Sequence, residues 1–159
     1  MKLTLQRRSH SVAPVSPSRA KGLGYVVDLD PTHRILRITV TTALTDEASW
    51  EIHRTVVGLI FKGGPYSVIA DLSHVVDFPV SCNTIRALAA TAPAVPAGGR
   101  RVIVASQPAL FGLARMFEMH RDAMGVQLHV VYSMDEAYDL LEVAPQDFTQ
   151  RLFPEDGTT

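Results

Sequence analysis

The sequence has one cysteine, few aromatic residues and almost no net charge. The single cysteine, Cys82, excludes a disulfide framework and a cysteine-rich zinc site, and it suits the reducing cytoplasm, where we expect this chain to act. A formal net charge of -1 provides no overall basic field, so we expect no binding to nucleic acid. No apolar run approaches the ~20 residues of a membrane span, so we expect none. With 159 residues, 47% of them hydrophobic, the chain is long enough for one folded domain.

The two ends of the chain differ in composition from its middle. Residues 1–22 contain five basic residues and no acid, so they carry +5; because the whole chain carries -1, the remainder carries -6. Serine and proline recur in this stretch, which predicts a flexible basic arm, although an organellar transit peptide has a similar composition. Residues 144–159 contain Pro145, Pro154 and Gly157 and predict a C-terminal tail. Its apolar residues, Phe148, Leu152 and Phe153, are candidates for docking back onto the domain.

Residues 23–143 alternate between strand and helix patterns. The β-rich segments that we interpret as strands are 25–29, 34–41, 67–72, 101–105 and 126–132. Helical patterns cover 45–61, 81–91 and 108–124, and a last helix follows Ser133. This order, ββαβαβαβα, predicts a single α/β domain with a mixed, mostly parallel five-stranded sheet and about four helices.

Four residues mark the predicted helix ends. Thr45, Ser81 and Ser133 each stand directly before a helical pattern and are typical N-caps. Glu136 follows Ser133 by three positions, as in a capping box. Gly125 is predicted to close the 108–124 helix in the left-handed conformation.

The loop and helix start at residues 71–84 contain several residues capable of chemistry. Ser81 as nucleophile, His74 as base and Asp77 as orienting group would make a hydrolytic triad, but the G-x-S-x-G pattern of a nucleophile elbow is absent. Cys82 stands in the first turn of a helix, where the dipole lowers a thiol pKa, yet a lone cysteine is more often a small apolar residue. We therefore favour a protein that is not an enzyme and has no catalytic residue.

Metal and anion sites receive little support from the sequence. The six histidines show no pair at metal-ligand spacing, so we expect neither a metal nor another cofactor. The sequence GGRR at 98–101 has the composition of an anion-binding turn, but it precedes a strand, and we interpret it as a solvated turn.

The 108–124 helix is apolar around most of its circumference. One face, predicted to pack on the sheet, consists of Leu110, Leu113, Ala114, Phe117 and Met124. A second apolar face consists of Gly112, Met116, Met119 and Ala123. The remaining polar stripe consists of Arg115, Glu118 and Asp122. Three covers for the second face remain open: the C-terminal tail, a second copy of the chain, or an apolar ligand or other partner.

Two segments resemble a known family. The sequences DLSHVVDFP at 71–79 and FGLARMFEMHRD at 111–122, with the strand and helix order around them, resemble STAS domains, and within these the SpoIIAA-like (anti-sigma-factor-antagonist-like) bacterial branch. The resemblance implies a STAS-like α/β fold over residues 23–143. In STAS antagonists an Asp-Ser-Ser-Gly sequence contains a serine that a kinase phosphorylates; this chain has Pro-Val-Ser-Cys at 79–82. The resemblance therefore implies Ser81 as phosphoacceptor, with Thr84 as the second candidate.

Two functions follow as hypotheses. The first is a non-enzymatic regulatory or protein-interaction module that binds an unknown protein partner and a second copy of itself. The alternative is a domain that binds or senses a small apolar molecule, a lipid or a metabolite, in a pocket near Phe78, Phe111 and Met116. The residues that we expect to face a partner or ligand are Ser73, His74, Asp77, Phe78, Phe111, Gly112, Met116, Met119 and Ala123.

Overall fold

The computed structural model describes residues 24–64, 66–92, 95, 98–123, 125 and 127–153. The predicted basic arm, residues 1–22, lies outside these residues. The strands are β1 (Tyr25–Asp30), β2 (Ile35–Val40), β3 (Ser67–Asp71), β4 (Arg101–Val104), β5 (Leu128–Val131) and β6 (Gln150–Phe153). They form one sheet in the order β5-β4-β3-β2-β1-β6. The pairs β2–β3, β3–β4 and β4–β5 are parallel, whereas β1 pairs antiparallel with both β2 and β6.

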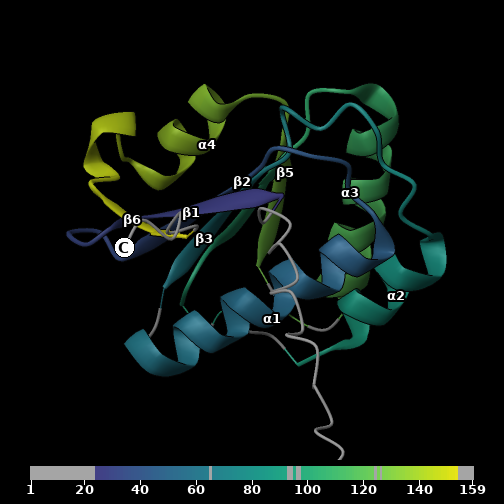
Figure 1. Cartoon of the computed structure of the whole chain (residues 1–159), viewed down its shortest axis with the longest axis horizontal. Helices are drawn as coiled ribbons and strands as arrows, with labels where there is room; N and C mark the ends of the chain where they lie inside the picture. The colour runs from purple at the N-terminus through teal and green to yellow at the C-terminus, as the bar shows by residue number, and fades with distance from the viewer. Residues whose placement is uncertain are drawn as a thin grey trace, which may run out of the picture.

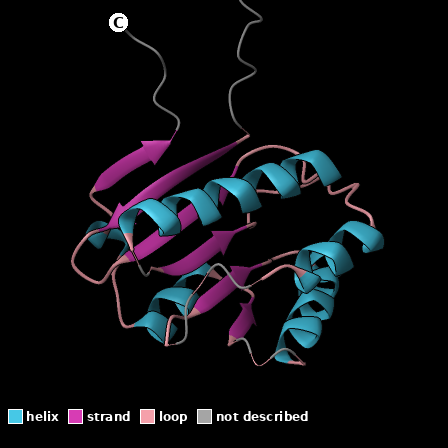
Figure 2. Ribbon diagram, turned by 90° about the horizontal axis from the view of Figure 1, so that it is seen from below, coloured by secondary structure: helices cyan, strands magenta, loops and turns pink. Residues whose placement is uncertain are grey.

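The helices cover both faces of the sheet, so the predicted α/β class is confirmed. They are α1 (Asp46–Gly63), α2 (Cys82–Ala90), α3 (Pro108–Asp122) and α4 (Met134–Leu141), followed by a short 3-10 helix, η1 (Pro145–Asp147). Helices α1, α2 and α3 pack on one face of the sheet, and α4 packs on the other (Figure 1). Figure 2 shows α1 in front of the sheet, running roughly along the direction of the strands.

Alternation along the strands separates the two cores. In β4, Ile103 points toward α1, α2 and α3, while Val102 and Val104 belong to the core beneath α4. All three side chains are at most 7% exposed, which is the double-sided burial expected of a central parallel strand. The parity also places Arg101 on the same face as Ile103.

The predicted helix caps are present. The hydroxyl oxygens of Thr45, Ser81 and Ser133 accept hydrogen bonds from the third amide beyond each, at 3.0–3.2 Å. The Glu136 carboxylate accepts from the amide of Tyr132, at 3.0 Å, one residue earlier than in a standard capping box. Gly125 has the predicted positive φ of 73°.

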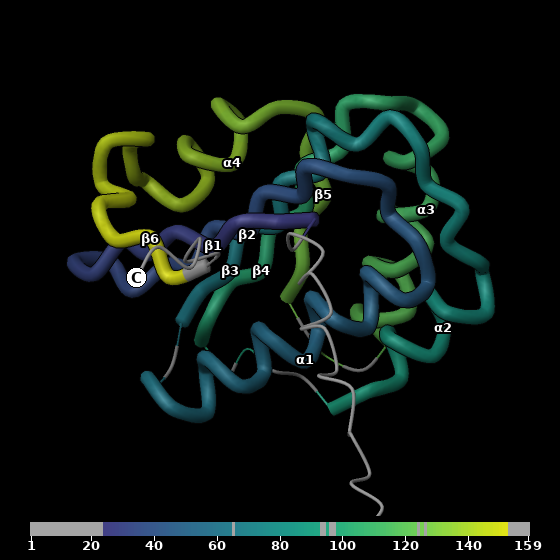
Figure 3. The backbone as a smooth tube through the Cα atoms, in the orientation of Figure 1, coloured from purple at the N-terminus to yellow at the C-terminus, as the bar shows by residue number. Residues whose placement is uncertain are grey.

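The strand count is the main correction to the sequence-based fold. The prediction of five strands is wrong, because residues 150–153 of the expected tail form β6 at the edge of the sheet beside β1 (Figure 3). Arg151 supports this pairing by donating through Nε to Asp28 Oδ1 at 3.1 Å. The expected docking of Phe148 and Leu152 is confirmed, since both pack against the core, while the side chain of Phe153 lies outside the described part.

Candidate functional site

The rim loop, residues 72–80, lies at the carboxyl end of β3 and is anchored by its neighbours. The Leu44 amide donates to the carbonyl of Asp77 at 2.9 Å, and Gln107 donates through Nε2 to the carbonyl of Val75 at 2.8 Å. Val75 and Val80 are only 1% and 8% exposed. The loop is therefore held by packing and by hydrogen bonds from two other segments.

The predicted partner-facing residues of the rim loop differ in their exposure. His74 and Asp77 are exposed, whereas Ser73 and Phe78 are half-buried. The Ser73 amide donates to Asp71 Oδ1 at 2.9 Å, which fixes the first turn of the loop. His74 and Asp77 thus remain accessible to a partner, and Phe78 only in part.

Ser81 links the start of α2 to the start of α1. Its amide donates to Asp46 Oδ1 at 2.6 Å, and its hydroxyl donates to Asp46 Oδ2 at 3.1 Å. The Ser81 amide is the main cause that lowers the pKa of Asp46, with smaller contributions from the Thr84 and Ser81 hydroxyls. A carboxylate held in this way is a weak base, so Asp46 positions Ser81 better than it could activate it.

The considered triad is not assembled in the structure. Among the described residues, the hydrogen bonds of Ser81 go to Asp46 and Thr84, and none goes to His74 or Asp77. The second candidate phosphoacceptor, Thr84, is buried at 9% exposure. Phosphorylation of Ser81 stays a prediction of the family resemblance.

The other hydroxyl groups at the carboxyl edge of the sheet have structural partners. Thr45 and Ser133 cap helices, and the Ser106 hydroxyl donates to the carbonyl of Tyr132 at 3.0 Å. Cys82 is exposed in the first turn of α2. Thr45 and Ser133 thus act as the capping residues that the sequence predicts, whereas Ser106 does not cap α3, whose N-cap is Gln107.

The second apolar face of α3 is not covered by the described part of the tail. Helix α3 packs next to β5, at one edge of the sheet, whereas β6 lies at the opposite edge. The prediction that the tail covers this face of α3 is therefore wrong for residues 144–153. Met119 is 66% exposed, Gly112 and Ala123 are exposed, and Met116 is half-buried. Phe111 is stacked on Tyr132, with ring centroids 3.9 Å apart.

The polar stripe predicted for α3 is wrong in part. Arg115 and Asp122 are exposed, but Glu118 is only 6% exposed and forms an ion pair with Arg115. Arg121 is 1% exposed. The C-terminal half of α3 therefore buries charged groups, and its packing against α2 causes this departure from a simple amphipathic helix.

A cavity of about 100 Å³ lies between the sheet and helices α1, α2 and α3. Apolar side chains from both layers form its walls, among them Val40, Ile103, Leu88 and Leu110. Only two of the lining residues, Ser49 and Arg101, carry polar side chains. Such a space is larger than a single water molecule requires, and it is partly open to the surface.

The cavity occupies a different place from the pocket predicted in the sequence. Phe78, Phe111 and Met116 are not among its lining residues. Instead α3 contributes the face that packs on the sheet, including Ala114 and Phe117. The sheet and the helices do form a partly open apolar pocket, as the ligand hypothesis requires, but its lining residues differ from those predicted.

Arg101 is the charged residue of the cavity wall. Its Nε is buried with no hydrogen-bond partner, and its guanidinium carbon lies 5.3 Å from the centroid of the Phe117 ring. Burial, together with the positive charge of Arg121, lowers the pKa of Arg101 to about 10, so the group stays protonated at neutral pH. A cation thus lines an otherwise apolar chamber.

Arg101 was not predicted as a site residue, because it stands both at the end of the predicted solvated turn, 98–101, and at the start of the predicted strand, 101–105. Arg100 does point away from the cavity, because it is exposed and donates to the carbonyl of Leu140 at 2.8 Å. Arg101 is already the first residue of β4, two positions before the inward-facing Ile103. The alternation of the strand was the signal that could have placed it inside.

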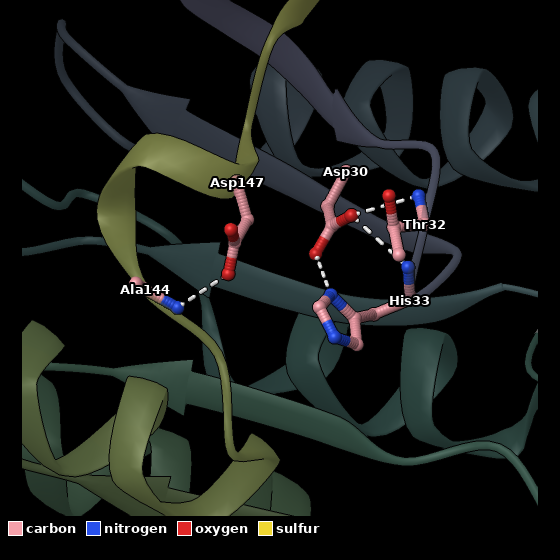
Figure 4. Close-up of polar contacts among 5 residues, drawn as sticks. All are labelled: Asp30, Thr32, His33, Ala144 and Asp147. Carbon is pink, nitrogen blue, oxygen red and sulfur yellow. Dashed lines mark hydrogen bonds and ion pairs between the residues drawn. The ribbon is translucent and has the colours of Figure 1, made fainter.

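One group of side chains among the described residues comes close enough to share a metal ion. Asp30, His33 and Asp147 bring their ligand atoms within 4.8 Å of one another (Figure 4). Each carboxylate also has a structural role: Asp30 accepts from His33 Nδ1 at 2.6 Å and from the Thr32 amide at 2.9 Å, and Asp147 accepts from the Ala144 amide at 2.8 Å. The prediction that the chain binds no metal remains untested.

Comparison with protein-family models and with curated proteins finds no match for this chain. The STAS-like resemblance therefore stays a prediction. Within the described residues, no helix combines the length and the apolar character that crossing a membrane requires.

Proposed function

We propose that this chain is a non-enzymatic domain that binds a small, mainly apolar molecule between its sheet and helices α1 to α3. The observation that carries the proposal is the cavity of about 100 Å³ with almost entirely apolar walls. Water makes few favourable contacts with apolar walls of this kind, so burying an apolar molecule against them is favourable. A small apolar ligand would make such contacts, and ligand sites in proteins commonly combine apolar walls with a few polar groups.

Filling the cavity provides the test. Ala114 lines the cavity on α3, and Ala114→Leu places three further carbon atoms there; the matched control, Ala87→Leu, adds the same atoms at an exposed position of α2. Native mass spectrometry of freshly purified protein detects a retained molecule, and thermal-shift assays measure binding of hexanol and hexanoate. We expect binding to wild type and Ala87→Leu and its loss in Ala114→Leu. Failure of all these probes to bind wild type, with no retained molecule, would overturn the proposal.

A second candidate function is self-association through the outer face of α3. The exposed Met119 favours it, because a methionine that is 66% exposed beside exposed Gly112 and Ala123 provides an adaptable apolar surface. It agrees with the interaction module that the STAS-like resemblance implies. Light scattering coupled to size exclusion should show a dimer for wild type and a monomer for the double variant Met116→Glu/Met119→Glu. A wild-type monomer would remove this candidate.

A further inference from the structure

The half-buried Arg101 stands in the cavity wall as a positive charge with no counter-ion among the described residues. Arg101 and Arg121 both place their guanidinium carbons 5.3 Å from the centroid of the Phe117 ring. Arg121 is compensated, because it donates to the carbonyls of Thr91 and Leu88 at the end of α2, at 2.8 and 3.1 Å. Arg101 forms no ion pair and no side-chain hydrogen bond within the described chain.

The undescribed positions between residues 24 and 153 do not supply the missing acid. They are prolines 65, 93 and 96, alanines 94 and 97, Met124 and Val126, none of which is ionisable. On the opposite face of the sheet, the half-buried Arg37 does have an acid, donating to Asp28 Oδ2 at 3.0 Å. A buried charge without a partner costs free energy, and an anion brought by a ligand would offset that cost.

The groups around Arg101 add further positive charge. The pKa of His53 on α1 is lowered, first by burial and then by the charges of Arg101, Arg121 and Arg54. No acid contributes to the shifts of Arg101 or His53. The electrostatic potential at this end of the cavity therefore favours an anion.

We propose that the ligand of the cavity is an apolar carboxylic acid, with its carboxylate bound to Arg101 and its hydrocarbon part between the sheet and the helices. This inference rests on the proposed function and specifies the chemical class of its ligand. One guanidinium with free donors matches one carboxylate in shape and charge, and such charge-assisted hydrogen bonds are strong in a desolvated site. A phosphate carries more charge and takes more donors than this single group offers.

The size of the cavity limits the apolar part. A cavity of about 150 Å³ with apolar walls accommodates benzene. The space of about 100 Å³ here is smaller but partly open to the surface, so it suits a short acid such as hexanoate, whose end could extend out of the opening, better than a long-chain lipid. Phe117 and Leu110 would contact its hydrocarbon part, since both line the cavity.

The test compares matched probes by isothermal titration calorimetry with the full chain. Hexanoate and hexanol share a chain and differ in charge, acetate lacks the chain, and hexyl phosphate carries a different anion. Wild type should bind hexanoate at least about tenfold more tightly than each of the other three. Arg101→Met keeps the volume and removes the charge, so it should lose at least about tenfold in hexanoate affinity while keeping hexanol affinity within about threefold. The control Arg86→Met, at an exposed position of α2, should behave as wild type.

The outcomes separate this inference from the proposed function. Equal binding of hexanol and hexanoate to wild type, or an unchanged preference in Arg101→Met, would overturn the carboxylate while leaving an apolar site. Tighter binding of acetate or hexyl phosphate than of hexanoate would overturn the ligand class. If wild type binds neither hexanol nor hexanoate, both proposals fail.

A readout in wild type keeps the inference testable if Arg101→Met does not fold. NMR titration follows the His53 ring with and without saturating ligand. A bound carboxylate near Arg101 should raise the pKa of His53, because a nearby negative charge favours the protonated imidazole. Hexanol should leave the pKa of His53 unchanged. An unchanged pKa with bound hexanoate would place the carboxylate elsewhere and contradict the inference.

Discussion

Arg37 in β2 and Arg101 in β4 belong to the same sheet, but their side chains lie on opposite faces of it and have different partners. Arg37 donates to Asp28 and to the hydroxyl of Tyr138, at 3.0 and 2.7 Å, and its guanidinium lies 4.4 Å from the centroid of the Phe148 ring. Burial lowers the pKa of Arg37, but these partners more than offset it, so its pKa is raised. Burial lowers the pKa of Arg101 without such partners. Arg37 thus has hydrogen-bond and ion-pair partners within the fold, whereas Arg101 has none of these among the described residues.

Arg101→Met should therefore stabilise the ligand-free protein. Removing a half-buried charge whose Nε is buried without a hydrogen-bond partner, while keeping the side-chain volume, should raise the free energy of unfolding by about 1 kcal/mol. Urea unfolding at neutral pH measures this change, and Arg86→Met, at an exposed position, should leave the value within about 0.5 kcal/mol. A destabilised Arg101→Met variant would mean that Arg101 supports the fold, contrary to the site described here.

His53 should make the protein less stable in mild acid. Its folded-state pKa lies below the ordinary value of 6.5, so the unfolded chain takes up a proton at a higher pH than the folded protein does. Neutral His53 therefore contributes fully to the free energy of unfolding above pH 6.5, and this contribution is lost as the pH falls below 6.5. The Tm of wild type should therefore fall more between about pH 7.5 and about pH 5.5 than the Tm of His53→Gln. His120→Gln, at an exposed position, should follow wild type; equal slopes for all three would contradict the prediction.

At the scale of the elements, Ser81 determines where α2 begins. Its hydroxyl caps the Thr84 amide at 3.1 Å, and its own amide is held by Asp46 of α1. Ser81→Ala should lower the free energy of unfolding by about 1 kcal/mol, because it removes both the cap and the hydroxyl contact with Asp46. Chemical denaturation measures the loss. Ser81→Asp retains a capping oxygen but places a second carboxylate beside that of Asp46, so it should be no more stable than Ser81→Ala. Wild-type stability of either variant would contradict a stabilising contact between Ser81 and Asp46.

Strand β6 depends on the packing of the segment that leads into it. Phe148 contacts Tyr138, with ring centroids 6.0 Å apart, and lies under Arg37. Phe148→Ala should lower the free energy of unfolding by about 2 kcal/mol, since the ring is partly buried. The nearby Gln146→Ala, at an exposed position of η1, is the control and should change it by less than about 0.5 kcal/mol. A loss for Gln146→Ala as large as for Phe148→Ala would show that the ring contact is not the cause.

The elements differ in how far the sequence predicts them. Helix α2 was predictable because Ser81 caps it and Ile85 and Leu88 repeat at helical spacing toward the core. Strand β6 was not, because its four residues adopt strand geometry through pairing with β1; Arg151 and its partner Asp28 are 123 positions apart. Separation along the chain also hid the approach of Asp147 to Asp30.

The candidate site was predicted less well than the fold. The predicted site residues lie in the rim loop and on the outer face of α3, where polar groups capable of chemistry and an unpartnered apolar stripe stand out in the sequence. The cavity is formed mainly by ordinary apolar residues, and the void between them depends on how side chains from four elements or more fit together. No pattern in one segment reports such a void. The alternation of β4 could have predicted that Arg101 faces the helices, but no sequence pattern could have predicted that its Nε lacks a hydrogen-bond partner.

At the scale of the whole molecule, the two candidate functions use opposite sides of α3. Ala114 and Phe117 line the cavity, whereas Met119 points outward. The two activities should therefore be separable: Ala114→Leu should lose hexanoate binding and keep the wild-type oligomeric state, and Met119→Glu should keep hexanoate binding within about threefold. Calorimetry and light scattering on the same samples measure both properties. Joint loss of binding and association in either variant would show one shared site.

The location of a bound acid is the most direct observation. Isotope-filtered NMR on methyl-labelled protein records nuclear Overhauser effects between hexanoate and assigned methyl groups. We predict contacts with methyl groups of Leu88, Ile103 and Leu110, which line the space between the sheet and the helices. Contacts confined to exposed methyl groups such as those of Val57 and Val76, with none from the three lining residues, would contradict a ligand site inside this domain.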